Sequence, residues 1–323
     1  MNTLKRMMVA LLVLLPLSTG MAFADTEHGY SRIYIFGASF IDPGNRYADT
    51  GLISYPPFFD PFGPVAYDVG GHRATNGRTW VEVMAHEMKL TKWAKPAYRH
   101  AGFGNYAYDH AHVRDVQDPF IKWGPSVGDQ IKRWAVADGY CGSAPMNDTL
   151  FVLDSGGADL LDVLQPPIGE DPQLIVAELL GAIASHVEYL YDCGARNFLI
   201  ADLLPLGIAP GVALVGNPDI ANEKAKDFNM ALQFVIAGLE DHPKFGDLNV
   251  RTTGFYGFGE TLVTLAEELG FTYVTEPCIT YFVIEDAYCD KPKEYLFWDL
   301  LHPSKAAHAL LGRHALGQLP VLD

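Results

Sequence analysis

The fold of this 323-residue chain is decided by one short stretch, which reads YIFGASFIDPGN and occupies residues Tyr34–Asn45. Residues Ile33 to Phe36 are β-branched or aromatic, so they predict a short buried strand that ends at Gly37. A serine, Ser39, follows two positions later, where open α/β sheets bind their ligands. On this local pattern alone, a helix N-cap is the favoured role for Ser39. A role as nucleophile depends on the far end of the chain.

That far end reads YLFWDLLHP at residues Tyr295–Pro303 and places Asp299 three residues before His302. In a single turn this spacing brings both side chains to one face, where the carboxylate orients the imidazole and stabilises its protonated form. With Ser39 added, the chain supplies a nucleophile, a base and an orienting acid. The competing interpretation is a capping aspartate beside a surface histidine.

Together the two stretches resemble the GDSL, or SGNH, family of serine esterases and lipases. That family opens with a strand followed by Phe-Gly-Asp-Ser-Leu-x-Asp-x-Gly-Asn and ends with Tyr-Leu-Phe-Trp-Asp-x-x-His-Pro. The resemblance implies that Ser39 is the nucleophile, His302 the general base and Asp299 the residue that orients it. It also implies a small-molecule or lipid ester as substrate, with no metal and no organic cofactor. Ser39 is not in a G-x-S-x-G motif, which argues against the ordinary α/β-hydrolase fold.

The chain departs from the family pattern around the nucleophile and the oxyanion hole. Ala38 stands where the family usually has Asp. In the family, the negative charge that develops on the substrate meets the N–H of the nucleophile, a glycine N–H and an Asn side chain. The glycine segment, Asn-Tyr-Ala-x-Gly-Gly-Ala, here has Asp109 and His110 in place of both glycines. The Gly-x-Asn-Asp segment has Ala158 after Gly157, so the Asn is missing. Losing one such donor typically costs on the order of a hundred- to a thousandfold in rate.

Two compensations and one rival site follow from these residues. A backbone N–H at position 109 or 110 could still serve as donor, and the His110 side chain could replace the missing Asn. Asp109, His110 and His112 also lie close enough in sequence to suggest a metal site, although loop histidines are more often solvated or hydrogen-bonded. Asp154, Asp159 and Asp162 form a second acidic group, for which a helix-capping role of Asp159 is the simpler explanation.

These observations leave three functions open. The first is a serine esterase or lipase that hydrolyses lipid acyl or short acyl esters through an acyl-enzyme. The second is a catalytically impaired or inactive relative that binds a lipid or glycan, which the altered oxyanion segments favour and the Ser-His-Asp set opposes. The third, metal-dependent hydrolysis through the His110 region, is a minor alternative.

The N-terminus predicts export. Lys5 and Arg6 precede an apolar run, and Ala22-Phe23-Ala24 has the form of a signal-peptide cleavage site. The predicted mature chain, residues 25–323, is a single domain that is secreted or periplasmic and has no stable membrane anchor. Its formal charge, −16 before and −18 after removal of Lys5 and Arg6, makes nucleic acid a poor partner. The oligomeric state is not predicted.

The four cysteines all lie in this mature part, which predicts two disulfides in an oxidising compartment. Cys278 and Cys289 flank a compact loop and are expected to pair, which leaves Cys141 for Cys193. A zinc site is the rival, but no C-x-x-C spacing supports it.

Strands alternate with helices along the rest of the chain, which predicts a parallel sheet covered on both faces. The expected fold is a three-layer α/β/α sandwich of flavodoxin-like type, as in the family. Strands are predicted at 33–36, 149–153, 197–201 and 248–252, and helices at 81–90, 126–137, 175–191, 220–239, 261–269 and 304–316. A proline-rich aromatic segment at 55–64 is predicted as a loop, either at the mouth of the site or packed on itself.

Overall fold

The structure is a computed structural model that describes residues 28–51, 67–116, 124–167, 169–279 and 288–322. The predicted signal peptide and the aromatic loop at 55–64 lie outside these residues.

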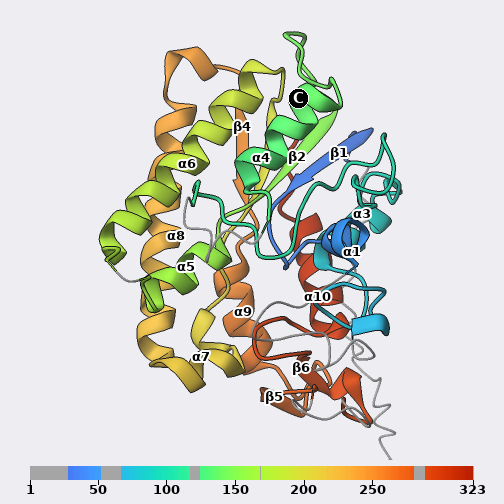
Figure 1. Ribbon diagram of the computed structural model, residues 1–323, viewed down its shortest axis with the longest axis vertical. Helices are drawn as coiled ribbons and strands as arrows, with labels where there is room; N and C mark the ends of the chain where they lie inside the picture. The colour runs from blue at the N-terminus through green and yellow to red at the C-terminus, as the bar shows by residue number, and fades with distance from the viewer. Residues whose placement is uncertain (1–27, 52–66, 117–123, 168, 280–287, 323) are drawn as a thin grey trace, which may run out of the picture.

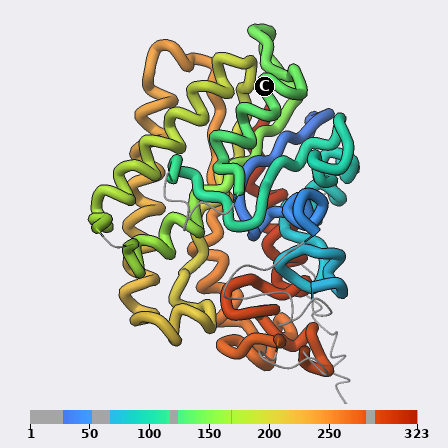
Figure 2. The backbone as a smooth tube through the Cα atoms, viewed as in Figure 1, coloured from blue at the N-terminus to red at the C-terminus, as the bar shows by residue number. Residues whose placement is uncertain are grey.

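Four parallel strands form the central sheet, and they neighbour one another in sequence order. They are β1 (Arg32–Phe36), β2 (Thr149–Asp154), β3 (Asn197–Ala201) and β4 (Asn249–Thr252). On the outer side of β1, the N–H of Ile35 donates to the carbonyl of Gly104 (2.9 Å) and the N–H of Tyr106 donates to the carbonyl of Ile35 (2.7 Å). Residues 104–108 therefore run parallel to β1 as an extra edge, visible as the teal segment beside the blue strand in Figure 2. With this edge, the order of the five segments is 2-1-3-4-5, the flavodoxin-like order, and the predicted fold class is confirmed.

Both faces of the sheet are buried at β1, β2 and β3, because alternate residues of these strands enter different core clusters. Tyr34 and Phe36 of β1 pack on one side, whereas Ile33 and Ile35 pack on the other. This two-sided burial is the reason why the strands read as continuous apolar runs. The helices on the first side are α4 (Val127–Lys132), α6 (Pro172–Asp192) and α8 (Pro218–Glu240), and those on the second are α3 (Trp80–Glu87), α9 (Phe255–Thr264) and α10 (Lys305–Leu316) (Figure 1).

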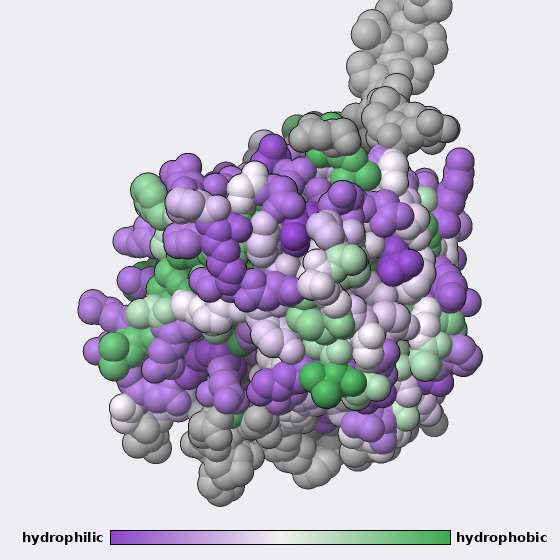
Figure 3. Space-filling view, turned by 90° about the horizontal axis from the view of Figure 1, so that it is seen from above, coloured by the Kyte–Doolittle hydropathy of each residue, from purple (hydrophilic) through white to green (hydrophobic). Residues whose placement is uncertain are grey.

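The long helix α6 shows how the covering helices are specified. Asp171 accepts the N–H of Gln173 and Pro172 occupies the first turn, so the start of the helix is set locally. Its buried residues recur at helical spacing and face the sheet: Ile175, Leu179, Ile183, Val187 and Leu190. By length and hydropathy α6 also passes as a membrane span, but this apolar stripe is part of the core. Elsewhere the surface of the described residues is mostly hydrophilic on the face shown in Figure 3, in keeping with the acidic composition.

Most predicted elements are present, with bounds shifted by a few residues. Ser126 caps α4 as expected, in a capping box with Asp129, and the helix continues as a π-helical turn over Arg133–Ala137. The helix predicted at 261–269 is wrong in position: α9 begins at Phe255 and ends at Thr264. Its first five residues include Gly257 and Gly259, which are unusual in a helix, but Phe255 is fully buried and fixes the helix against the core.

The remaining elements lie at the carboxyl ends of the strands. They are the short helices α1 (Asn45–Thr50), α5 (Gly157–Leu164) and α7 (Pro210–Val215), and a second, two-stranded parallel sheet made of β5 (Tyr273–Pro277) and β6 (Tyr295–Phe297). Two disulfides join Cys141 to Cys193 and Cys278 to Cys289, as predicted. The second disulfide lies beside β5 and β6, next to the buried Trp298.

Candidate active site

The structure brings together the three side chains that the two terminal motifs supply. Ser39 lies just beyond β1, and its Oγ is 2.8 Å from Nε2 of His302. On the other side of the ring, Nδ1 of His302 lies 2.8 and 3.0 Å from the two carboxylate oxygens of Asp299. A chain of three groups therefore runs from hydroxyl to imidazole to carboxylate, in the geometry that activates a serine.

A tight turn orients Asp299 toward the histidine. Its Oδ1 accepts the backbone N–H groups of Leu301 (2.8 Å) and His302 (2.6 Å), and its Oδ2 accepts the hydroxyl of Tyr67 (3.0 Å). The N–H of Trp298 donates to the carbonyl of His302 (2.8 Å) and closes the same turn. These bonds fix the carboxylate, so its direction does not depend on the histidine alone.

The same contacts decide the charges of the pair. Burial on its own would lower the pKa of His302, but the charge and hydrogen bond of Asp299, with a smaller contribution from Asp109, outweigh it and raise that pKa above its ordinary value. Burial would likewise raise the pKa of Asp299, yet the imidazole and the two backbone N–H groups hold it below its usual range. Asp299 is thus ionised, and His302 is a stronger base than a free histidine.

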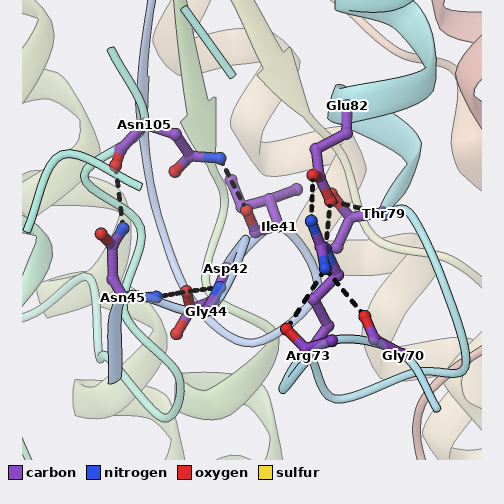
Figure 4. A network of polar contacts seen from close by, with 10 residues as sticks. Ile41, Asp42, Gly44, Asn45, Gly70, Arg73, Thr79, Glu82 and Asn105 are labelled. Carbon is purple, nitrogen blue, oxygen red and sulfur yellow. Dashed lines mark hydrogen bonds and ion pairs between the residues drawn. The ribbon is translucent and has the colours of Figure 1, made fainter. Parts of the chain in front are cut away.

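The segment Thr75–Trp80 binds the loop that carries His302. The Thr75 hydroxyl donates to the carbonyl of Pro303 (2.8 Å), and the Asn76 side chain accepts the N–H of Lys305 (2.6 Å) at the start of α10. The N–H of Trp80 donates to Nδ1 of the buried His308 (3.1 Å). Just before this segment, Arg73 forms a bidentate ion pair with Glu82 (2.6 and 2.7 Å) and anchors the loop to α3 (Figure 4).

A buried polar network shapes the loop that carries Ser39. The side chain of Gln130 of α4 makes two hydrogen bonds with Gly37, accepting its N–H and donating to its carbonyl at 2.9 Å each. The N–H of Ala38 donates to Asp154 at the end of β2 (3.2 Å). A Cβ at position 37 would lie 2.4 Å from the Cβ of Asp154, so only glycine fits there. Neither Tyr67 nor Gln130 was predicted, because no local signal marks partners 232 and 93 residues away.

Ser39 is not a helix N-cap: the helix that follows, α1, has Gly44 as its N-cap, and the carboxylate of Asp42 binds the amides at its start. That carboxylate accepts the N–H groups of Gly44 (2.7 Å) and Asn45 (2.6 Å), whereas α1 begins only at Asn45. The side chain of Asn45 in turn donates to the carbonyls of Asn105 (2.8 Å) and Ala107 (2.7 Å), as Figure 4 shows in part. The loop after β1 is therefore tied to the extra edge of the sheet.

Asp42 also accepts the N–H of Asp109 at 2.8 Å. Of the two backbone groups suggested as replacement oxyanion donors, the N–H of Asp109 thus already has a partner inside the protein. Burial and the neighbouring charge of Asp109 raise the pKa of Asp42 to about 7. Asp109 is itself buried, 8% exposed, and its charge contributes to the raised pKa of His302.

The other altered positions lie at the carboxyl end of β2. Gly157 and Ala158 begin α5 and are half-buried, whereas Asp159 in the same turn is fully buried. The prediction that Asp159 caps α5 is wrong, because the N-cap of this helix is Gly156. The buried carboxylate of Asp159 instead accepts the N–H groups of Val113 (2.8 Å) and Arg114 (3.3 Å).

Of the residues considered as metal ligands, Asp159 and Asp162 pair with Arg114, and His112 contacts Asp162. Arg114 contacts Asp159 (Nε–Oδ1 3.3 Å), Asp162 and Glu170 (2.9 Å), and His112 lies 3.2 Å from Asp162. Across the described ranges, no group of three or more His, Cys, Asp or Glu side chains is arranged to hold a metal ion.

Comparison with known proteins identifies the family of this chain. A model of the GDSL-like lipase/acylhydrolase family matches residues 33–315. Two relatives from Arabidopsis thaliana are GDSL esterase/lipase At1g29670, 25% identical over 94% of this chain and 92% of that protein, and GDSL esterase/lipase 6, 22% identical over 94% and 91%. Among solved structures, an acetyl-xylooligosaccharide esterase from Geobacillus aligns with 14% identity and a TM-score of 0.47 over 90% of this chain and 97% of that one. The match spans the sheet, the serine loop and the histidine loop, and the chain belongs to the GDSL-like lipase/acylhydrolase family.

Proposed function

We propose that this ester hydrolase of the GDSL family works through an acyl-enzyme on Ser39, with His302 as base and Asp299 as its orienting acid. The observation that carries the proposal is the unbroken set of contacts from Oγ of Ser39 to Nε2 of His302 and from Nδ1 of His302 to Asp299, each at 2.8 Å. Such a set is the usual means of activating a serine at neutral pH.

In the first step, Oγ of Ser39 forms a bond to the carbonyl carbon of the ester, and its proton passes to Nε2 of His302. The electron pair of the carbonyl π bond moves onto the carbonyl oxygen. When that pair returns, the bond to the alcohol oxygen breaks and the departing alcohol takes the proton from His302. Water then repeats the sequence on the acyl-enzyme and releases the acid. Asp299 stays ionised throughout, which agrees with the lowered pKa that the imidazole gives it.

The substrate that we propose is a lipid acyl ester or a short acyl ester. Support for this class comes from the family, whose members are described as lipases and acylhydrolases. We also propose that the protein acts outside the cytoplasm, secreted or periplasmic. The two disulfides support this location, because such bonds persist in oxidising compartments, and the sequence of residues 1–24 has the form of an export signal.

The test is hydrolysis of p-nitrophenyl esters of increasing acyl length by the protein and by Ser39→Ala. We expect turnover by the wild type and a loss of at least about a thousandfold in the variant. Ser185→Ala is the matched control, because Ser185 is exposed on α6 and bonds only to the carbonyl of Gly181. Turnover that survives in Ser39→Ala would reject Ser39 as nucleophile.

A second candidate function is favoured by Ala158. Position 158 offers no side-chain donor, so a relative that binds an ester or glycan without turnover is compatible with the altered site. It is distinguished by a folded wild type that hydrolyses no ester and whose Ser39 is not labelled by a fluorophosphonate.

A further inference from the structure

The turn at residues 108–111 adjoins the nucleophile. The N–H of Tyr108 donates to the carbonyl of Gly37 (2.9 Å), and the N–H of Ala111 donates back to the carbonyl of Tyr108 (3.0 Å). Ala38 packs in one buried cluster with Tyr108 and Ala111. The turn therefore rests directly on the residue that precedes Ser39.

His110 occupies the third position of this turn with a φ of +68°. In a four-residue turn, a positive φ at the third position normally calls for glycine. A histidine in this conformation raises the free energy of the folded state, and such strained residues are found most often at functional sites. The positive φ of His110 therefore suggests a function for its side chain.

The side chains place His110 next to α5, the helix that carries Ala158. Asp162 lies four residues after Ala158 and so shares its face of the helix. His112 contacts Asp162 at 3.2 Å, and the ring of His110 lies edge-to-face against the ring of His112, with centroids 6.3 Å apart. Through His112 and Asp162, His110 is linked to the face of α5 that also carries Ala158.

We propose that the imidazole N–H of His110 is a catalytic hydrogen-bond donor to the oxyanion that forms when Ser39 attacks an ester, a role that rests on the proposed function. The reaction needs donors for the electron pair that moves onto the carbonyl oxygen, and Ala158 supplies none. His110 transfers no proton in this role. It holds a hydrogen bond to the oxygen while His302 carries the proton of Ser39.

The protonation state of His110 suits this role. Burial, together with the charges of His112, Arg46 and His302, lowers the pKa of His110 to about 4, while Asp162 opposes the shift. At neutral pH the ring is therefore neutral and carries one N–H donor. A neutral ring also adds no positive charge beside His302, so it does not impede the protonation of the base.

Substitutions at position 110 distinguish the effect of the imidazole donor on catalysis from the effect of the positive φ. His110→Gly removes the donor but suits the positive φ, and His110→Asn keeps an N–H donor on a residue type that tolerates such a φ. For p-nitrophenyl esters we expect kcat of His110→Gly to fall about a hundred- to a thousandfold, with KM changed less than threefold, and His110→Asn to recover at least tenfold of that loss. Lys89→Gly is the matched control, because Lys89 is exposed on a loop and has a φ of +62°.

A double substitution completes the test. Ala158→Asn in the His110→Gly background supplies a donor from α5, so it should restore part of the kcat that His110→Gly loses. The proposal is overturned if His110→Gly keeps at least a third of the wild-type kcat, or if the loss appears in KM alone. Absence of any Ser39-dependent turnover in the wild type would remove the proposed function and this donor role together, whereas turnover that does not need His110 would remove only the latter.

Discussion

Nε2 of His302 lies 2.8 Å from Oγ of Ser39, although the two residues are 263 positions apart in the chain. The distance is that of a direct hydrogen bond, so a proton can pass between the two atoms without a bridging water. The His302 side chain is still 20% exposed, which leaves the pair accessible from one side.

The raised pKa of His302 predicts the pH dependence of the reaction. Only neutral His302 can accept the Ser39 proton, so kcat/KM should be low in acid and rise to a plateau as the ring loses its proton. Because Asp299 raises the pKa, the midpoint should lie above the ordinary histidine value of about 6.5. A pH series with a soluble ester measures it, and a midpoint below that value would contradict the assignment.

Asp299→Asn should slow catalysis and lower that midpoint. An amide cannot stabilise the protonated ring, and in a well-studied Ser-His-Asp enzyme the same change costs about four orders of magnitude in kcat. The pKa of His302 should then fall, because burial is left as the main influence on it. The measurement is kcat and its pH profile for Asp299→Asn. The control is Asp227→Asn, a substitution on the exposed face of α8. Equal effects in the two variants would argue against a specific role for Asp299.

Restoring the family residue at position 38 should destabilise this protein. Ala38 is buried against Tyr108 and Ala111, and its own N–H already binds the carboxylate of Asp154. A second carboxylate at position 38 would be buried beside that charge, which costs on the order of 3 kcal/mol of unfolding free energy. Urea unfolding at pH 7 measures the loss. Ala38→Ser should be far milder, and Ala38→Asp with Asp154→Asn should recover part of the deficit; no recovery would mean that crowding, not charge, is the cause.

The two disulfides should differ in their effects on activity. Replacing both cysteines by serine should cost about 3 kcal/mol of stability for Cys278–Cys289, which spans 11 residues, and about 4 kcal/mol for Cys141–Cys193, which spans 52. Only the first pair adjoins Trp298, through the N–H of Ile279 that donates to the Trp298 carbonyl (2.9 Å). We therefore expect kcat to fall in the Cys278/Cys289 variant and to stay near wild type in the other, at a temperature where both are folded. If kcat fell only in the Cys141/Cys193 variant, the Cys278–Cys289 disulfide would not support the histidine loop.

His308 should make the protein sensitive to acid. Burial lowers the pKa of His308 to about 3, whereas in the unfolded chain it is near 6.5. Below about pH 6.5 the unfolded state therefore binds a proton that the folded state does not, and stability falls by up to about 1.4 kcal/mol per pH unit. His308→Asn keeps an acceptor for the Trp80 N–H and does not titrate, so its stability should fall less steeply in acid. Chemical unfolding from pH 7 to pH 4 compares the slopes, and parallel curves would refute the prediction.

The sheet was predictable because β1, β2 and β3 are buried on both faces and appear in the sequence as mostly apolar runs. The edge at 104–108 was not, because it is defined by backbone approach. A Cβ at Gly104 would lie 2.2 Å from the carbonyl oxygen of Ile33, a constraint that no hydropathy pattern expresses. The shifted start of α9 has a similar origin, since burial of Phe255 overrides the glycines around it.

The two end motifs predicted Ser39, Asp299 and His302 as the site residues. They did not predict the residues that hold these three in place by hydrogen bonds. Tyr67, Gln130 and Asn76 reach the site from distant segments, and a hydrogen bond between distant residues leaves no periodic trace in the sequence. The same is true of the N–H of Asp109, whose acceptor Asp42 lies 67 residues earlier. The catalytic roles themselves stay predictions until the Ser39 and Asp299 variants are measured.

The hold of Thr75 and Asn76 on the loop around Pro303 has a consequence for biosynthesis. A ribosome makes the serine loop and its brace first and the histidine loop within the last twenty-five residues of the chain. Under the proposed roles, a polypeptide that stops before Asp299 carries the serine without its base. The proposed activity therefore depends on the histidine loop, which is made long after the serine loop and its brace.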